Sequence, residues 1–328
     1  MAELRSAAQA YNRAMQTDNG TDVDPALTER LGPHARKRLA IEADHAAEVE
    51  SRPSVRDWYR APALIRGCLR MVGMLERARR NALDIRIVEN HLPIVGLDPA
   101  FDGFTLLHLS DLHVDINETF VPALLERLAR VEYDVCVMTG DYRSKTYGPS
   151  DATIDGMRRI CAELHDPMYA VLGNHDGIAL VPAFEAMGIR MLMNEAVTLQ
   201  RGDARIALVG IDDHHFFRLG SIPKAISGVP AEVPTILLSH APEIYRQAAQ
   251  AGLDVMLCGH THGGQICLPG GHPITVDSAI PRRMGRGAWR RRNMVGYTSP
   301  GAGTSIVDVR INCPPEITLH RLRAVPGA

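Results

Sequence analysis

Short apolar runs alternate with amphipathic stretches along the chain from Phe101 onward. Short runs of aliphatic and β-branched residues predict strands, and longer stretches with apolar residues at helical spacing predict helices. The predicted strands are residues 104–110, 134–139, 168–172, 205–209, 235–239 and 254–258, and residues 303–311 and 316–322 are predicted to pair. The predicted helices are residues 121–131, 153–164, 181–187 and 242–251. This alternation predicts an α/β domain with layered sheets.

The first 98 residues have a different pattern. They are rich in Ala, Arg and Glu and poor in β-branched runs. This composition predicts a helical N-terminal extension over residues 1–98, partly flexible, followed by an α/β domain over residues 99–328.

Residues 58–83 stand out within that extension, because apolar residues recur at helical spacing with arginines between them. A basic amphipathic helix of this kind can lie in a membrane interface and attract anionic lipid. The alternative is a helix that packs its apolar stripe on its own domain and turns its arginines to water. The pattern leaves both interpretations open.

Overall composition excludes little. The chain has 328 residues, 45% hydrophobic and 23% charged, with a net charge of −2, so whole-protein charge gives no reason to expect nucleic-acid binding. Six cysteines without a C-x-x-C pair favour a reducing compartment. The polar N-terminus is not typical of a signal peptide, and no apolar run approaches the roughly 18 residues that span a bilayer. We therefore expect a cytoplasmic protein, peripheral to the inner membrane at most.

Potential metal ligands follow nearly every predicted strand. In chain order they are Asp111, His113, Asp141, Asn174, His240, His260 and His262. Ligands of α/β sheets bind outside the carboxyl ends of the strands, so these side chains are expected to share one rim. Oxygen and imidazole donors without thiolate suit divalent ions such as Mn, Fe, Zn or Co better than a structural zinc site.

The same residues form five sequence blocks in a fixed order. The blocks are Asp111-Leu112-His113, Gly140-Asp141, Gly173-Asn174-His175-Asp176, His240, and Gly259-His260-Thr261-His262. This pattern resembles the calcineurin-like metallophosphoesterase family, and the run GHTHGGQ resembles a bacterial branch that includes membrane-associated phosphodiesterases. The resemblance covers roughly residues 83–322.

The resemblance implies a fold, a metal centre and a mechanism. The fold is a four-layer β-sandwich flanked by helices. One ion is held by Asp111, His113 and His262, the other by Asn174, His240 and His260, and Asp141 bridges them. A hydroxide activated by the metals attacks phosphorus, His175 protonates the leaving oxygen, and Asp176 orients the His175 ring.

Four further residues are predicted to bind substrate. Arg143 follows Asp141 where many relatives carry an acidic residue, and His214 follows a strand that reaches the same rim. Arg282 and Arg283 belong to an arginine-rich segment, residues 281–293, whose Trp289 suits stacking on a base or a place at a lipid interface. The alternative is a solvated basic loop.

These residues predict hydrolysis of a phosphodiester or pyrophosphate bond in a small anionic phosphoester. A lipid-linked or nucleotide-linked substrate such as UDP-diacylglucosamine fits the basic segments, and relatives of this branch are similar to such pyrophosphatases. The alternatives are a general phosphodiesterase acting on cyclic nucleotides or phospholipid headgroups, and a non-catalytic metal-bound interaction module. Nucleic acid is a poor partner, because only one loop is strongly basic.

Overall fold

Two mixed β-sheets form the centre of the protein. The computed structural model describes residues 25–51 and 61–326. In the first sheet the strand order is β1 (Arg86–Val95), β14 (Glu316–Val325), β2 (Thr105–Leu109), β3 (Val135–Met138), β4 (Met168–Ala170) and β5 (Ile189–Met191). In the second it is β12 (Gly287–Arg291), β13 (Met294–Thr298), β9 (Val255–Cys258), β8 (Thr235–Leu238), β7 (Ala204–Gly210) and β6 (Glu195–Arg201). A short pair, β10 (Cys267–Leu268) and β11 (His272–Pro273), lies outside both sheets.

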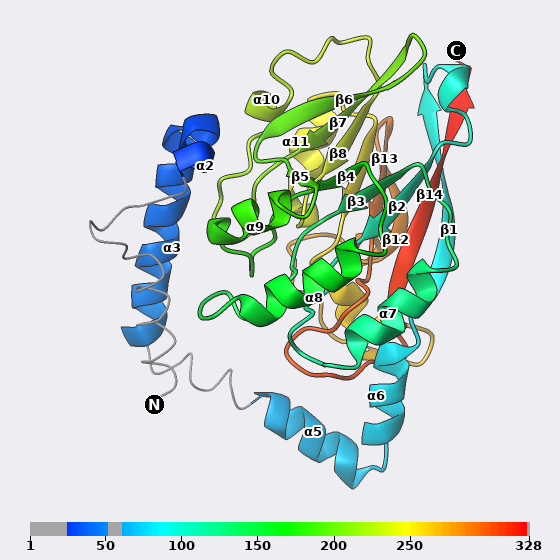
Figure 1. Cartoon of the computed structure of the whole chain (residues 1–328). Helices are drawn as coiled ribbons and strands as arrows, with labels where there is room; N and C mark the ends of the chain where they lie inside the picture. The colour runs from blue at the N-terminus through cyan, green and yellow to red at the C-terminus, as the bar shows by residue number, and fades with distance from the viewer. Residues whose placement is uncertain (1–24, 52–60, 327–328) are drawn as a thin grey trace.

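The two sheets pack face to face, and helices cover their outer faces. Alternate residues of β3 show this arrangement: Val135 and Val137 belong to the hydrophobic cluster between the sheets, whereas Cys136 and Met138 belong to the cluster beneath the helices. Side chains of a strand point alternately to opposite faces, so a strand that is apolar throughout must be covered on both sides. The helices on the first sheet are α7 (Phe120–Leu128), α8 (Asp151–Cys161) and α9 (Val181–Glu185) (Figure 1). Those on the second are α10 (Ile222–Ala225) and α11 (Tyr245–Gln250). The predicted four-layer α/β fold is confirmed.

Most predicted elements are present with shifted ends, but one is wrong. Residues 303–311 do not form a strand paired with residues 316–322. The apolar residues of this segment serve packing instead of strand pairing: Val307 and Val309 pack against Leu75 and Ala78 of α6 (Leu75–Leu83). Strand β14 pairs instead with β1 in parallel and with β2 in antiparallel orientation.

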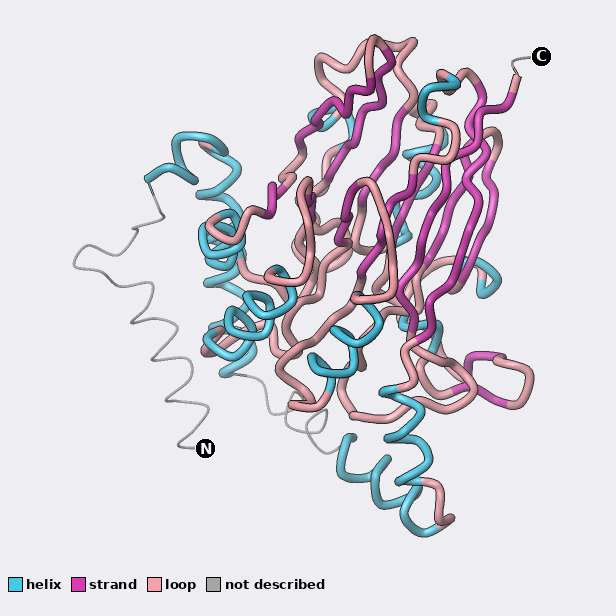
Figure 2. Tube along the Cα trace, turned by 45° about the vertical axis from the view of Figure 1, so that its right-hand side comes forward, coloured by secondary structure: helices cyan, strands magenta, loops and turns pink. Residues whose placement is uncertain are grey.

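The N-terminal segment contains both helices and a strand. The helices are α2 (Pro25–Leu31), α3 (Pro33–Ser51), α5 (Ala61–Met71) and α6. Residues 86–95, within the predicted helical extension, form edge strand β1 of the first sheet (Figure 2). The domain division at residue 98 stays a prediction, and the expected flexibility falls largely on residues outside the described ranges. Helix α3 lies along one side of the molecule, away from α5 and α6 (Figure 1).

The amphipathic stretch over residues 58–83 is two helices within its described part. Helix α5 ends before Gly73, whose φ of +68° interrupts the helical backbone, and α6 follows. Ile65 and Leu69 pack on the domain, as the second interpretation predicts. Leu64, Met71 and Val72, however, are 69%, 81% and 66% exposed. Among the described helices, none is long and apolar enough to cross a membrane.

Candidate metal centre

The predicted ligands meet at one rim, where strands of both sheets end. Sheet one carries Asp111 and His113 after β2, Asp141 after β3 and Asn174 after β4. Sheet two carries His240 after β8, and His260 and His262 after β9. The site therefore lies between the sheets and requires both, as expected for ligands beyond the carboxyl ends of parallel strands.

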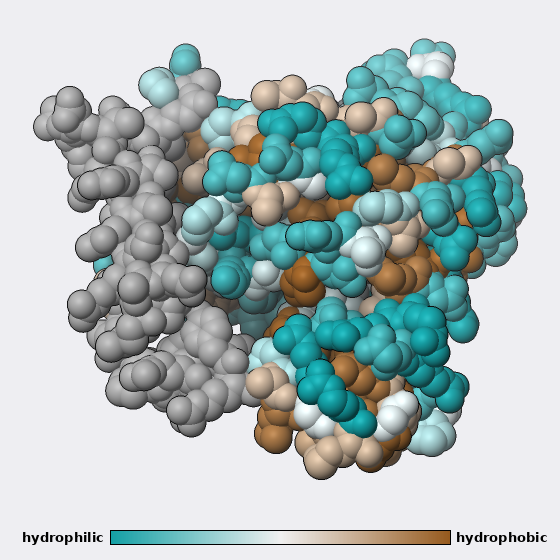
Figure 3. Space-filling view, turned by 60° about the horizontal axis from the view of Figure 1, so that its bottom comes forward, coloured by the Kyte–Doolittle hydropathy of each residue, from teal (hydrophilic) through white to brown (hydrophobic). Residues whose placement is uncertain are grey.

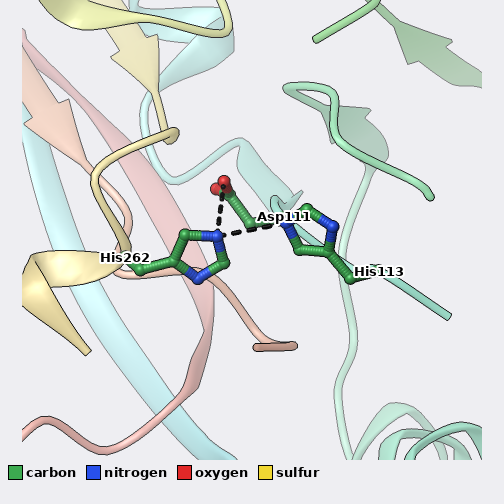
Figure 4. A group of neighbouring side chains, drawn as sticks. All are labelled: Asp111, His113 and His262. Atoms are coloured by element: carbon green, nitrogen blue, oxygen red, sulfur yellow. Dashed lines mark hydrogen bonds and ion pairs between the residues drawn. The ribbon is translucent and has the colours of Figure 1, made fainter. Parts of the chain in front are cut away.

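The first cluster comprises Asp111, His113 and His262, all buried (Figure 4). The Nε2 atom of His262 lies 3.1 Å from Nε2 of His113 and 3.3 Å from Oδ1 of Asp111. Two imidazoles and a carboxylate thus converge on a space of the size that one cation fills.

The second cluster comprises Asp141, His240 and His260, also buried. The Nε2 atom of His240 lies 2.9 Å from Oδ1 of Asn174 and 3.2 Å from Oδ2 of Asp141. The same Oδ2 atom is 3.7 Å from Nε2 of His113, in the first cluster. Asp141 therefore lies between the two clusters.

Backbone carbonyls orient two of the histidines. The Nδ1 atom of His113 is 2.8 Å from the carbonyl oxygen of Arg143, and Nδ1 of His240 is 2.7 Å from that of Thr139. A carbonyl only accepts, so each Nδ1 carries the proton and each Nε2 presents its lone pair to the clusters. This is the orientation that metal ligands require.

The loops that carry the ligands are sterically tight. Asp111, His113, Asp141, His260 and His262 have φ values of 52°, 40°, 59°, 71° and 49°. Such left-handed conformations in non-glycine residues cost energy and concentrate at functional sites. Adjacent glycines permit the crowding: a Cβ atom on Gly173 would lie 2.2 Å from Oδ1 of Asp141, and one on Gly259 would lie 2.2 Å from Oδ2 of Asp111.

Electrostatics keep Asp141 ionised. Burial alone would raise its pKa, but His240, His175 and His113 hold it well below the usual value. Burial in turn disfavours a charged His240, yet Asp141 raises the pKa of His240 to about 10. In the metal-free protein His240 is therefore protonated, and its positive charge stabilises the neighbouring carboxylates; a metal ion would replace that proton.

The residues present fit metal ions. The donors are carboxylate, amide oxygen and imidazole, and the buried Nε2 atom of His260 has no hydrogen-bond partner among the described residues. A buried nitrogen without a partner is costly unless something binds it. The two buried clusters are consistent with a dinuclear metal site.

Comparisons with known proteins agree with this geometry. The family model of calcineurin-like phosphoesterases matches residues 104–264, which include every predicted ligand. The chain is 28% identical over 267 residues to the metallophosphoesterase YkoQ of Bacillus subtilis, covering 76% of this chain and 95% of YkoQ. It is 29% identical over 232 residues to phosphodiesterase YaeI of Escherichia coli, covering 67% and 82%. It is 30% identical over 217 residues to YpbG of Bacillus subtilis, covering 65% and 78%.

The chain belongs to the calcineurin-like phosphoesterase family. The resemblance inferred from the sequence blocks is thereby confirmed, and with it a metal-dependent phosphoesterase.

His175 lies at the mouth of this phosphoesterase site and is only partly buried. Its backbone N–H donates to Oδ1 of Asp141 at 3.0 Å, and its Nδ1 lies 3.2 Å from Oγ1 of Thr146. The role predicted for Asp176, orienting the His175 ring, stays a prediction. The Asp176 carboxylate accepts backbone N–H groups of Gly173, Asp141 and Tyr142 at 2.8, 2.7 and 2.9 Å, so it holds the ligand loops together.

The predicted substrate-binding residues lie in different environments. Arg143 is buried and donates to the carbonyl oxygens of Gly148 and Pro149, and its contact with substrate phosphate stays a prediction. His214 is partly exposed and its Nδ1 atom has no partner among the described residues. Arg282 and Arg283 are exposed on the short helix η5 (Arg282–Met284).

Trp289 does not face a ligand, contrary to expectation. It is 8% exposed, packs beneath the second sheet's helices and donates its indole N–H to Oγ1 of Thr298 at 2.9 Å. The arginine-rich segment is nevertheless tied to the metal centre, because Oγ1 of Thr261 donates to the carbonyl oxygen of Gly285 at 2.6 Å.

A buried hydrogen-bond chain, not foreseen from the sequence, reaches Asp111 from the far side. Nε2 of His320 lies 3.2 Å from Nδ1 of His108, and Nε2 of His108 lies 2.8 Å from Oγ1 of Thr139. The Thr139 hydroxyl donates to Oγ of Ser110 at 2.7 Å, and the Ser110 hydroxyl donates to Oδ2 of Asp111 at 2.5 Å. The Ser110 hydroxyl must donate to the carboxylate, so each preceding group donates in the same direction. The side-chain amide of Asn90 lies 3.0 Å from Nδ1 of His320 and donates to it, so His320 donates to His108 through Nε2; burial lowers the pKa of both histidines and keeps both neutral. The His108 side chain is completely buried.

This neutrality predicts an acid-sensitive fold. Burial lowers the pKa of His108 from 6.5 to about 3, so between these values the unfolded chain binds more protons and stability falls as pH decreases. Substituting His108→Gln should lower the free energy of unfolding of the metal-free protein at both pH values. The loss should be about 2 kcal/mol smaller at about pH 5 than at about pH 7.5. Urea unfolding at both pH values measures it. An equal cost at both would show that His108 is not kept neutral by the fold.

Glu243 was also not foreseen, and it lies behind His260. A carboxylate oxygen of Glu243, a ring nitrogen of His215 and a ring nitrogen of His260 lie within 4.8 Å of one another. Burial alone would raise the pKa of Glu243, but its hydrogen bond with His215, 3.0 Å long, lowers it to about 2. Its Oε2 atom is buried without a hydrogen-bond partner among the described residues, as is Nε2 of His260. Glu243 therefore has one carboxylate oxygen free to accept a hydrogen bond next to the imidazole of His260, from the ring nitrogen that does not bind the metal.

We therefore expect Glu243 to support His260 as a metal ligand. Carboxylates that orient ligand histidines raise metal affinity by about 10- to 100-fold, so Glu243→Gln should weaken binding of the second ion by that factor. Calorimetric titration of metal-free protein measures this affinity. The exposed Glu232→Gln is the control, and equal affinities in both variants would exclude the role.

Proposed function

We propose that the protein hydrolyses phosphodiester or pyrophosphate bonds at a dinuclear centre bridged by Asp141. The observation that carries this proposal is the position of Asp141, whose Oδ2 atom faces both clusters. Asp111, His113 and His262 would hold one ion, and Asn174, His240 and His260 the other. Two such ions supply Lewis acidity and a water nucleophile at neutral pH. Mn, Fe, Zn and Co all suit these donors.

His175 completes the proposed chemistry. Its loop is bonded to the Asp141 carboxylate through the backbone N–H of His175, and its partly exposed ring lies beside that of His113, with 5.5 Å between ring centroids. From there an imidazolium can donate a proton to the departing oxygen of the substrate. Asp176 contributes by holding the loop.

The substrate we propose is a small anionic phosphoester, lipid-linked or nucleotide-linked, such as UDP-diacylglucosamine. Exposed Arg282 and Arg283 support this proposal, because their segment is bonded to the His260–His262 turn through Thr261. Arginine forks suit phosphate groups. The second candidate is a general phosphodiesterase on cyclic nucleotides or phospholipid headgroups. The similarity to phosphodiesterase YaeI supports its diester chemistry.

Hydrolysis of two model esters tests the reaction type. Metal-stripped protein is given Mn²⁺, Zn²⁺, Fe²⁺ or Mg²⁺ and assayed with bis-p-nitrophenyl phosphate and p-nitrophenyl phosphate. We expect metal-dependent turnover with preference for the diester. Turnover of the monoester alone would refute diester specificity, and no turnover by protein that has bound its metal would favour a non-catalytic interaction module.

We also propose a peripheral contact with anionic membrane through α5, on a cytoplasmic protein. Leu64, Met71 and Val72 are exposed on or directly after α5, and Arg70 is exposed beside them. Hydrophobic side chains are visible at the end of the molecule that Figure 3 brings forward. Apolar side chains flanked by arginines suit insertion among acidic headgroups.

Vesicle binding measures the contribution of this face. Leu64→Gln combined with Val72→Gln should weaken binding to phosphatidylglycerol vesicles by about tenfold or more. The double variant lacks two large apolar side chains whose transfer from water into the membrane interface favours binding. Leu268→Gln, at a residue 55% exposed on β10, is the control. Binding that is unchanged by the double substitution, or absent in wild type, would contradict the contact.

A further inference from the structure

Helix α3 inserts a fully buried arginine behind the catalytic loop. Arg38 donates from Nη2 to the carbonyl oxygen of Asp176 at 2.6 Å, from Nη1 to Oδ1 of Asp212 at 2.5 Å and from Nε to Oε1 of Glu42 at 2.7 Å. Its guanidinium also lies over the ring of Phe217, 3.5 Å from the centroid. A buried guanidinium needs this many partners, because each unpaired donor would be costly.

Glu42, one turn further along α3, contacts the same loop. Its Oε1 atom accepts the backbone N–H of Ile178 at 2.9 Å. Arg38 therefore binds the carbonyl group before Gly177 and Glu42 binds the N–H group after it. A Cβ atom on Gly177 would lie only 3.4 Å from Oε2 of Glu42, so the helix and the loop are in direct contact.

A second contact anchors α3 to the neighbouring loop of the rim. Asp212 accepts from Arg38 through Oδ1, and its Oδ2 atom lies 2.8 Å from Nε2 of His34. Burial alone would raise the pKa of Asp212, but Arg38 and His34 keep it low, so the carboxylate is ionised. The helix is thus bonded to two separate segments that follow strands of the two sheets.

From these contacts we infer that α3 is a positioning element for catalysis, with Arg38 as its central residue. The loop of residues 174–178 carries Asn174 and His175 and is held from the domain side by the Asp176 carboxylate. Arg38 and Glu42 hold it from the opposite side. This inference rests on the proposed role of His175 as proton donor. It assigns function to a helix outside residues 104–264, the range that the family model matches.

The consequence for chemistry is specific. A proton donor acts only when its nitrogen is within hydrogen-bond reach of the departing oxygen, and a displacement of about 1 Å can cost about a hundredfold in rate. Loosening the loop should therefore slow hydrolysis most for substrates whose leaving group must be protonated as it departs. A nitrophenolate leaves readily without one, whereas a phenolate depends on it.

The test compares Arg38→Met and Arg38→Lys with Arg36→Met, in the full-length protein loaded with Mn²⁺. Arg36 is exposed on the same helix, so its substitution removes the same charge without touching the loop. Lysine at position 38 keeps the charge next to Asp212 but lacks the fork, and it remains informative if the methionine variant folds poorly. The readouts are hydrogen exchange of the peptide spanning residues 174–178, metal content, and kcat and KM on bis-p-nitrophenyl phosphate and diphenyl phosphate.

We expect hydrogen exchange in that peptide to be faster than in wild type for both Arg38 variants and unchanged for Arg36→Met. The metal content should be preserved in all three. On diphenyl phosphate kcat should fall by about 10- to 100-fold at nearly unchanged KM, and on bis-p-nitrophenyl phosphate much less. Unchanged exchange would overturn the inference whatever the activity. Faster exchange with equal losses on both esters would show a general structural role and also overturn it.

The exchange readout separates this inference from the proposed function. If the wild-type protein hydrolyses neither ester, the proposed function and the catalytic part of the inference both fail. Exchange then still decides whether α3 holds the loop. If wild type is active and the Arg38 variants match it on both esters, the inference alone fails.

Discussion

Substituting Asp141→Asn should abolish nearly all turnover and reduce the bound metal from two ions per chain to one or fewer. The Oδ2 atom of Asp141 lies 3.2 Å from Nε2 of His240 and 3.7 Å from Nε2 of His113, so its charge serves both clusters. Asparagine keeps the shape but loses the charge that offsets two cations. A loss of about 4 kcal/mol of transition-state stabilisation, or about a thousandfold in rate, is expected.

Metal analysis and kinetics on the same preparation measure this effect. Asp203→Asn, at an exposed residue away from the rim, controls for the loss of one carboxylate. Asp141→Asn also removes the carboxylate that pairs with His240, so it should cost the metal-free protein some stability, and circular dichroism of the same preparation checks that the variant is folded. Two tightly bound ions together with near-normal turnover would exclude Asp141 as the bridge.

Substituting His175→Ala should lower kcat by about 10²- to 10⁴-fold while leaving the metal content unchanged. The ring of His175 contacts Thr146 through Nδ1 and belongs to neither metal cluster, so its loss removes a proton donor and no ligand. The loss should be larger for diphenyl phosphate than for bis-p-nitrophenyl phosphate, because phenolate is the poorer leaving group.

His165→Ala is the matched control, since His165 is an exposed histidine stacked on Tyr133. Kinetics with both esters and metal analysis of both variants decide the result. Undiminished turnover in His175→Ala would remove His175 from the mechanism. A parallel loss of metal would instead make it part of the ligand set.

The ligand positions were predictable from sequence because each depends on local rules. An apolar run followed by Gly-Asp or Gly-His is a strand followed by a tight turn, and parallel strands end at a common rim. Asp111, Asp141 and His260 therefore come together as expected, although they are far apart in the chain.

The partners of those ligands were not predictable in the same way. Asp176 follows His175 directly, yet its carboxylate accepts N–H groups of Asp141 and Tyr142, which β3 brings beside it. Trp289 lies among arginines in the sequence but faces the core, because strand alternation places successive side chains on opposite sides.

The N-terminal segment shows the same limitation. Arg38 and Glu42 are four residues apart on α3, a spacing typical of an exposed helical ion pair. Only the docking of α3 onto residues 176–178 makes them fully buried. Nothing in the helix itself indicates which distant loop it covers.

The most direct test of the dinuclear account is a titration of metal-free protein with Mn²⁺ that follows bound metal and bis-p-nitrophenyl phosphate hydrolysis together. The account predicts that two ions bind per chain and that turnover rises with the second, because Asp141 faces both clusters. Full activity with a single bound ion, or two bound ions without hydrolysis, would contradict it.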